Sequence, residues 1–445
     1  MRHRAALTIP IAVVRRARTP LHEQIAAQIA GAVRGGALPG RTQLPSTRTL
    51  AELLGVSRGV TEAAYDLLIS GGFLDVRPGS GTFVPARHPL DPPPALVETD
   101  SSIVDLRPDR YCADAFPLFA WRSAWRRASF GPPPAGPLPP LGVAELRRAV
   151  AEHIRRTRGG YPPDGEVVIT GGTAHALRLV MDALGLDGPR VAVAEPAPPA
   201  VPRSVLGGPA GVPVDAEGIR VDAIPADCRA VVVGPDGQHP LGTILSARRR
   251  YELAEWARCT GGHVIETACD RVPRPAASPL PRLGSIVVGG FAELFTPALE
   301  LGYAVMPRDL AGVVAERIAD RAEQPPYVTQ LALAALLDSG TAIRLMHRLA
   351  RRFAHQRRIV DAVLSTIDSH PMDTAVLPLR DKEPEEAAAD LLDLGVRVAT
   401  LAPYYFAAEP PPALVLAYGH LPDAALRRAL TVIRAEAVRS GWGTA

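Results

Sequence analysis

Lys382 is the single lysine in a chain that contains 48 arginines. A lysine amine is the group that holds an aldehyde cofactor as a Schiff base. Lys382 stands in LPLRDKEPEEAAADLL, directly before a segment with the composition of a charged, solvent-exposed helix. The position is typical of a solvated side chain, so we expect no covalently held aldehyde cofactor.

Positive charge is concentrated in the first part of the chain. Residues 1–88 carry a net charge of +6, and the remainder of the chain carries −3. A basic segment on a mildly acidic body favours contact of that segment with a polyanion such as nucleic acid. Chance is the alternative on charge alone, because arginine is frequent throughout the chain.

Sequence patterns place this basic segment on a small set of helices and a hairpin. Apolar spacing predicts a helix over residues 20–35, and two further helices are predicted to begin after Ser46 and Ser57. Apolar alternation on both sides of PGSG (78–81) predicts a two-stranded hairpin. Helix, helix, short turn, helix and hairpin is the order of a winged helix-turn-helix.

DNA contacts are expected from the starts of the second and third helices and from the hairpin tip. Arg58 and Thr61 lie near the start of the third helix, where a major-groove helix touches base edges. Hydroxyl and guanidinium groups at the helix starts suit phosphate. The expected DNA-contacting residues are Ser46, Thr47, Arg48, Ser57, Arg58, Thr61 and Gly81. The alternative is a winged helix that makes only protein contacts.

The segment LPSTRTLAELLGVSRGVTEAAYDLLISGGFLDVRPGSGTFV resembles the DNA-binding domain of the GntR family, and its ending RPGSGTFV resembles the MocR subfamily. The resemblance covers nearly all of residues 20–84. It implies DNA-contact roles for Arg48, Ser57 and Arg58. The chain departs from the common pattern at Gly59-Val60, where small polar residues are usual, and this leaves the operator sequence open.

Residues 87–102 are rich in proline and lack apolar periodicity, which predicts a linker between a winged helix over 1–86 and a second domain over 103–440. In the second domain, short apolar runs alternate with helical segments, which predicts a mostly parallel α/β sheet. Residues 308–367 are expected to be largely helical. A smaller C-terminal α/β lobe is expected to follow.

Several stretches of the second domain resemble, in order, the fold-type-I aminotransferase-like domain of MocR-type regulators. They include VVITGGTAHAL, VAVAEPAPPA, VIETACD and GGFAELFTPALELGY. The resemblance implies a pyridoxal-phosphate site, but the residues that the cofactor requires are replaced. The replacements are Glu293 for the Schiff-base lysine, Thr267 for the pyridine-nitrogen carboxylate, Cys269 for the phenol-contacting tyrosine, Glu300 for the phosphate-binding arginine, Ala292 for the preceding serine and Pro198 for a ring-stacking aromatic.

Gly172-Thr173 at a helix start retains backbone N–H groups that could hold an anion. The resemblance also brings His239, Glu266 and Glu293, with Cys269 and Asp270, toward the carboxyl ends of the strands. These residues could bind a metal or an organic cation, but no compact ligand spacing supports a metal site. The alternative is a pocket that holds no ligand.

The leading interpretation is a DNA-binding regulator whose second domain forms a homodimer. This domain is expected to bind no pyridoxal phosphate. A ligand of its pocket would be a small-molecule effector. A pyridoxal-phosphate aminotransferase and a dimerisation or partner-binding scaffold are the alternatives. The apolar run near the N-terminus is interrupted by Pro10 and lacks a cleavage pattern, so we expect no signal peptide. No run is long enough for a membrane span, and four scattered cysteines fit a reducing cytoplasm.

Overall fold

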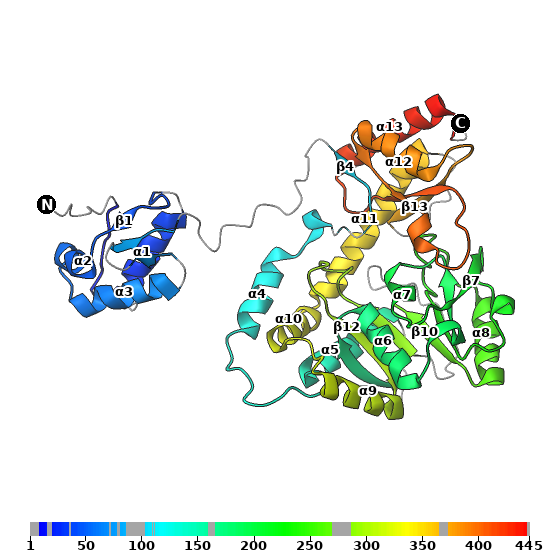
Figure 1. Ribbon diagram of the computed structural model, residues 1–445, viewed down its shortest axis with the longest axis horizontal. Coiled ribbons are helices and arrows are strands. Elements are labelled where there is room, and N and C mark those ends of the chain that lie inside the picture. The colour runs from blue at the N-terminus through cyan, green and yellow to red at the C-terminus, as the bar shows by residue number, and fades with distance from the viewer. Residues whose placement is uncertain are drawn as a thin grey trace. The chain divides into compact units, whose positions relative to one another are not determined.

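The structure is a computed structural model, and its chain contacts divide the chain into two compact units, 1–100 and 101–445 (Figure 1). The linker expected over 87–102 lies outside the described residues. The structure describes residues 9–15, 20–34, 37–70, 73–77, 81–85, 103–108, 110, 112–158, 165–268, 286–364 and 373–442.

The first unit has the expected winged helix-turn-helix, with one strand more than the sequence indicates. The additional strand β1 pairs antiparallel with β3, so that the wing is a three-stranded sheet in the order β1-β3-β2. Its elements are α1 (Leu21–Arg34), β1 (Gln43–Leu44), α2 (Thr47–Leu54), α3 (Arg58–Ser70), β2 (Asp75–Arg77) and β3 (Gly81–Phe83). The two-residue strand was missed because its hydrogen bonds come from a partner almost forty residues later in the chain.

Local signals fix both ends of α2. The Ser46 hydroxyl accepts a hydrogen bond from Thr49 N–H at 3.1 Å, which satisfies an N–H group that the first turn leaves unpaired. Gly55 follows the helix in the left-handed region with φ 59°, which costs glycine little. The predicted start of this helix after Ser46 is confirmed.

The second unit is built on an eight-stranded sheet in the order β5-β12-β11-β10-β9-β6-β7-β8. The pairs within β11-β10-β9-β6-β7 are parallel, and β12 and β8 run antiparallel to their neighbours. The strands are β5 (Gly165–Thr170), β6 (Val191–Glu195), β7 (Ala210–Asp215), β8 (Gly218–Ile219), β9 (Ala230–Val233), β10 (His263–Thr267), β11 (Ile286–Gly290) and β12 (Gly302–Pro307). The mostly parallel sheet is confirmed, and β7-β8 is an edge hairpin that the sequence analysis missed.

Helices cover both faces of this sheet. Alternate residues of each strand enter different cores: Val191 and Val193 of β6 pack with α6 and α9, whereas Ala192 and Ala194 pack with α8. On the face that α8 covers, the half of the sheet formed by β5, β11 and β12 is covered by α4, α5 and α10. The helices are α4 (Leu118–Ala128), α5 (Ala144–Arg158), α6 (Thr173–Leu184), α7 (Ala200–Arg203), α8 (Ala247–Thr260), α9 (Arg308–Arg321) and α10 (Tyr327–Asp338).

A smaller C-terminal lobe follows, as expected, and α11 (Thr341–Val363) runs from the large lobe into it (Figure 1). Leu345 and Phe353 of α11 belong to the large-lobe core, and Ile359 belongs to the small-lobe core. The remaining elements of this lobe are β4 (Val104–Asp105), β13 (Thr374–Pro378), α12 (Pro384–Asp393), β14 (Val396–Arg397), β15 (Ala399–Thr400), β16 (Ala413–Ala417) and α13 (Asp423–Ser440). Short 3₁₀ turns lie at η1 (Ala113–Ala115), η2 (Gly188–Arg190), η3 (Val221–Ala223) and η4 (Ala402–Tyr404).

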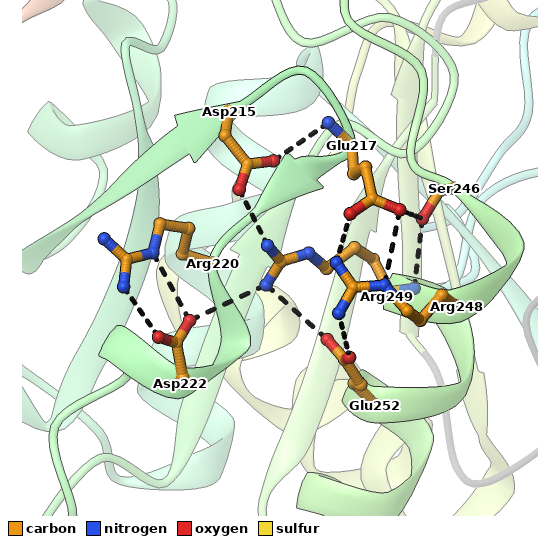
Figure 2. Close-up of polar contacts among 8 residues, drawn as sticks. All are labelled: Asp215, Glu217, Arg220, Asp222, Ser246, Arg248, Arg249 and Glu252. Atoms are coloured by element: carbon orange, nitrogen blue, oxygen red, sulfur yellow. Dashed lines mark hydrogen bonds and ion pairs between the residues drawn. The ribbon is translucent and has the colours of Figure 1, made fainter.

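An arginine–carboxylate network ties the β7-β8 edge to α8 (Figure 2). Arg249, whose side chain is 8% exposed, places Nη2 at 2.7 Å from Asp215 Oδ2. Its Nη1 lies 3.5 Å from Glu252 and 3.6 Å from Asp222. Contacts from three separate elements meet at one guanidinium, which has the planar fork that such pairing needs. No helix among the described residues is long and apolar enough to cross a membrane.

Candidate functional site

The winged helix presents Arg48 and Arg58 to solvent at the starts of α2 and α3. Arg48 Nε lies 3.3 Å from Glu52 Oε1, and Arg58 Nε lies 2.8 Å from Glu62 Oε1. The arginine side chains are 80% and 67% exposed. Exposed pairs of this kind contribute little to stability, so each guanidinium can exchange its carboxylate for a phosphate or a base edge at small cost.

Thr61 does not reach DNA, and that expectation is wrong. Its side chain is fully buried, and its hydroxyl lies 2.8 Å from Thr47 O and 2.9 Å from Arg58 O, so that it joins α3 to the start of α2. The sequence placed Thr61 in the first turn of a groove-binding helix. The face on which position 61 lies was decided by the packing of α3 on α2.

The other predicted DNA contacts have the following places. Ser57 is exposed directly before α3, and Thr47 is half-buried at the start of α2. The Ser46 hydroxyl is engaged in capping α2. Gly81 opens β3 with φ 114°, and a Cβ there would lie 2.8 Å from Gln43 Nε2, which gives this glycine a structural reason independent of DNA.

In the second unit a cavity of about 190 Å³ lies at the carboxyl ends of the parallel strands, between the large and small lobes. Alternation along β10 explains which predicted residues reach it. Thr267 points to the face of the sheet covered by α6 and lines the cavity, whereas Glu266 points to the opposite face. The polar and charged lining residues are Arg110, Thr173, Gln238, His239, Thr267, Glu293, Asp373, Thr374 and Tyr404.

Glu266 instead belongs to a buried charge cluster that the sequence analysis did not foresee. Arg158 Nη2 lies 3.3 Å from both Glu266 Oε2 and Asp236 Oδ2, and Arg250 Nη2 lies 3.6 Å from Asp236 Oδ1. All four side chains are less than a tenth exposed. Burial raises the pKa of Glu266, and the charges of Arg158 and Arg250 oppose that rise.

The cavity wall is held by two buried polar side chains. The Gln238 amide accepts from Gly234 N–H at 2.9 Å and donates to Pro196 O at 2.7 Å, which fixes the loop that carries His239. The Glu195 carboxylate accepts from the backbone N–H groups of residues 406, 407 and 408. That loop follows Tyr404, whose ring lies 5.3 Å from the ring of His239, centroid to centroid.

The predicted anion site at the start of α6 lies at the cavity. Thr173 lines the cavity, and Gly172 caps α6 with φ 93°. The neighbouring Gly171 N–H donates to His175 Nδ1 at 2.9 Å, so one backbone donor of this turn is already used. The side chain of Glu300 is exposed and is not among the residues that line the cavity.

Two charged lining residues were missed by the sequence analysis. Arg110 Nη2 lies 2.8 Å from Asp105 Oδ2. Burial alone would raise the pKa of Asp105, but Arg107 and Arg110 lower it to about 2. Asp373 lies at the start of β13, and no sequence pattern distinguishes it from other residues at strand starts. Both residues lie outside the stretches that resemble the cofactor site of the aminotransferase-like domain.

The residues present do not fit pyridoxal phosphate. Lys382 does not line the cavity, and its Nζ lies 2.6 Å from Asp390 Oδ2 of α12. The charged groups of the described lining are Arg110, Glu293 and Asp373, which is one negative charge in excess where the cofactor would bring a phosphate dianion. Cys269 and Asp270 lie outside the described residues. Within the parts of the chain that the structure describes, no group of three metal-ligating side chains occurs.

Known proteins resemble this chain in both of its units. The family model "Bacterial regulatory proteins, gntR family" matches residues 21–84. The chain is 32% identical to the HTH-type pyridoxine biosynthesis transcriptional regulator PdxR of Corynebacterium glutamicum, over 96% of this chain and 98% of that protein. It is 26% identical to the probable rhizopine catabolism regulatory protein MocR of Rhizobium meliloti, over 94% of each.

The second unit resembles solved aminotransferases. The multiple substrate aminotransferase of Thermococcus profundus superposes with a TM-score of 0.68 at 15% identity, over 77% of this chain and 93% of that chain. An archaeal alanine:glyoxylate aminotransferase gives a TM-score of 0.68 at 20% identity, over 76% and 91%. At these identities the likeness shows the fold alone. With the winged helix, the aminotransferase fold and a full-length relative taken together, the chain belongs to the MocR-type subfamily of GntR transcriptional regulators.

Proposed function

We propose that this regulator contacts its operator through Arg48, Ser57 and Arg58. The observation that carries the proposal is the exposure of both arginines at helix starts, each paired only with an exchangeable surface carboxylate. Arg58 opens the helix that a winged helix inserts in the major groove, so it reads bases. Arg48 opens the supporting helix, which crosses the backbone, so it holds phosphate.

The test is DNA binding by the full-length protein to an operator obtained by selection, at stated salt. Arg58→Ala should lose about 1–3 kcal/mol of discrimination between the operator and an unrelated duplex. Arg48→Ala should weaken both duplexes equally. Unchanged binding by both variants, with unchanged folding, would remove the assignment.

We also propose that the second unit is not an enzyme and binds no pyridoxal phosphate. The lining supplies Glu293 where an amine is required, and the single lysine of the chain is engaged with Asp390 in the small lobe. A carboxylate cannot form a Schiff base. Thr267 in the lining has no charge with which to keep a pyridine nitrogen protonated.

Incubation with pyridoxal phosphate followed by borohydride reduction tests this proposal. The wild type should give no cavity adduct by mass spectrometry and no visible absorbance band. Lys382→Arg, which has no lysine at all, is the matched control for modification at the surface. Glu293→Lys should still fail to hold the cofactor stably, because phosphate and ring-nitrogen partners are missing. A coloured wild-type protein as purified would contradict the proposal.

The second unit serves in this proposal as a homodimerisation domain in the cytoplasm, and its cavity is the place for a small-molecule effector. A two-fold dimer would read paired half-sites, which is how dimeric regulators match their operators. Sedimentation at micromolar concentration should give a dimer. A monomer that still binds the operator would contradict this role.

A further inference from the structure

The chain segment before the matched family region is docked on the winged helix. Residues 9–15 precede the matched residues 21–84. Ile9, Ile11 and Val13 alternate inward and pack against the core of the first unit. This segment, called the arm below, is therefore part of the folded unit.

Two glutamines of α1 hold the arm as a neighbouring strand would. Gln28 accepts from Ala12 N–H at 3.0 Å and donates to Ala12 O at 2.7 Å. Gln24 accepts from Val14 N–H at 2.9 Å and donates to Val14 O at 3.1 Å. Four residues of helix advance about 6 Å, and two residues of extended chain advance about 6.6 Å, so the two spacings match.

The docked arm ends with Arg15 at the turn between α2 and α3. Arg15 Nη2 donates to Gly55 O at 2.6 Å. Gly55 lines a surface hollow together with Arg48 and Arg58. Arg15 is exposed, and within the described residues it has no carboxylate partner, whereas Arg48 and Arg58 each have one.

We propose that the arm is a DNA-binding element, and that Arg15 is a phosphate contact beside Arg48 and Arg58; this rests on the proposed operator contacts. The bond to Gly55 uses one of the five N–H donors of the guanidinium and fixes its position. A prepositioned arginine with no carboxylate to exchange favours the DNA backbone, which carries no sequence information but binds cations strongly.

The arm is tested by equilibrium binding of the full-length protein to operator and to unrelated duplex DNA across a salt series. Arg15→Ala should weaken both duplexes equally and reduce the slope of log K against log salt by about 1. Between 50 and 200 mM salt, the variant should therefore lose about fourfold less affinity than the wild type. Arg15→Lys, which keeps the charge, should retain most of the slope.

Gln24→Ala/Gln28→Ala should reproduce the Arg15→Ala result, since it undocks the arm without removing its charge from the chain. Adding Arg15→Ala to that double variant should bring little further loss. Thermal unfolding of each variant confirms that the winged helix remains folded.

The Arg58→Ala variant distinguishes a failure of the arm proposal from a failure of the proposed operator contacts. If Arg58→Ala loses operator binding while Arg15→Ala keeps the wild-type affinity and salt slope, the arm is structural only and the inference falls alone. If the glutamine variant loses binding but Arg15→Ala does not, the inference falls as well. If neither Arg58→Ala nor Arg15→Ala changes binding, the proposed operator contacts fail first.

Discussion

Arginine–carboxylate ion pairs occur in both units of this protein, but an exposed pair leaves its arginine available to a ligand and a buried pair does not. On the winged helix, Arg48 and Arg58 lie 80% and 67% exposed against their glutamates. In the second unit, Arg249 is 8% exposed and is shared by carboxylates from three elements (Figure 2). An exposed pair costs little to break, so the arginine is available to a ligand. A buried arginine is committed to the fold, because breaking its pairs leaves charge without solvent.

The comparison also shows that exposure and pairing, and not the number of arginines, decide which arginines are available to a ligand. The number of arginines does not indicate where DNA binds, because the second unit holds Arg158, Arg249 and Arg250 in buried ion pairs. On the winged helix, Arg48 and Arg58 stand at helix starts with exchangeable partners, and exposed pairs such as that of Arg248 occur in the second unit as well. The following variants test this distinction, beginning with the largest expected effect.

Glu266→Ala should lower the unfolding free energy of the second unit by about 3–5 kcal/mol, because Arg158 and Arg250 would keep buried charge with one carboxylate fewer. Urea unfolding followed by far-UV circular dichroism measures the change. Glu255→Ala, which breaks the exposed pair with Arg258, is the matched control and should leave the unfolding free energy almost unchanged. Equal effects of the two variants would refute the division between committed and exchangeable pairs.

Arg249→Ala should cost about 2 kcal/mol, since it removes the hub of the network in Figure 2 and leaves the carboxylates to repel one another. The neighbouring Arg248, 57% exposed and paired with Glu217 and Glu252, provides the control. Arg248→Ala should lower stability much less than Arg249→Ala does. Thermal unfolding of both proteins checks the order, and the reverse order would contradict it.

Thr61→Val should lower stability by about 1 kcal/mol, because the buried hydroxyl loses its hydrogen bonds to Thr47 O and Arg58 O. Operator affinity of the folded variant should stay at the wild-type value. Thr47→Val, at the start of α2, should instead keep the wild-type stability and weaken operator binding if the Thr47 hydroxyl holds phosphate. Anisotropy titrations and thermal scans on the same samples distinguish the two. Lost sequence discrimination in Thr61→Val would restore it as a base contact.

Glu62→Gln should change stability by less than about 0.5 kcal/mol, since its pair with Arg58 is exposed. Operator affinity should rise slightly, because Arg58 no longer leaves a charged partner to meet DNA. Glu52→Gln tests the same point beside Arg48. A stability loss as large as that of Arg249→Ala would show that the winged-helix pairs are not exchangeable.

Local sequence signals were sufficient for the helices of the winged helix and for most strands of the large sheet. Ser46 and Gly55 mark the ends of α2 by side-chain and backbone chemistry that acts within a few residues. The apolar runs that become β6, β9 and β11 are buried on both faces and read directly from the sequence. The strands β1, β7 and β8 were missed because they are short or half-exposed, so their pattern is weak.

The candidate sites were predicted in part for the same reason. Arg48 and Arg58 follow from helix starts, and Glu293 and Thr267 follow from the resemblance to the aminotransferase-like domain. The tertiary structure decided which side each residue faces: Thr61 turned into the core, Glu266 turned away from the cavity, and Arg110 and Asp373 entered the cavity from distant segments.

The sequence by itself determined most helices and strands, the presence of a single lysine, and the basic character of the first unit. These properties depend on residue type and on the spacing of near neighbours. Only the tertiary structure decided which arginines are committed and which are exchangeable. The reason is that exposure and ion pairing depend on residues far apart in the chain: Arg249 meets Asp215 across the β7-β8 edge, and Arg15 meets Gly55 forty residues away.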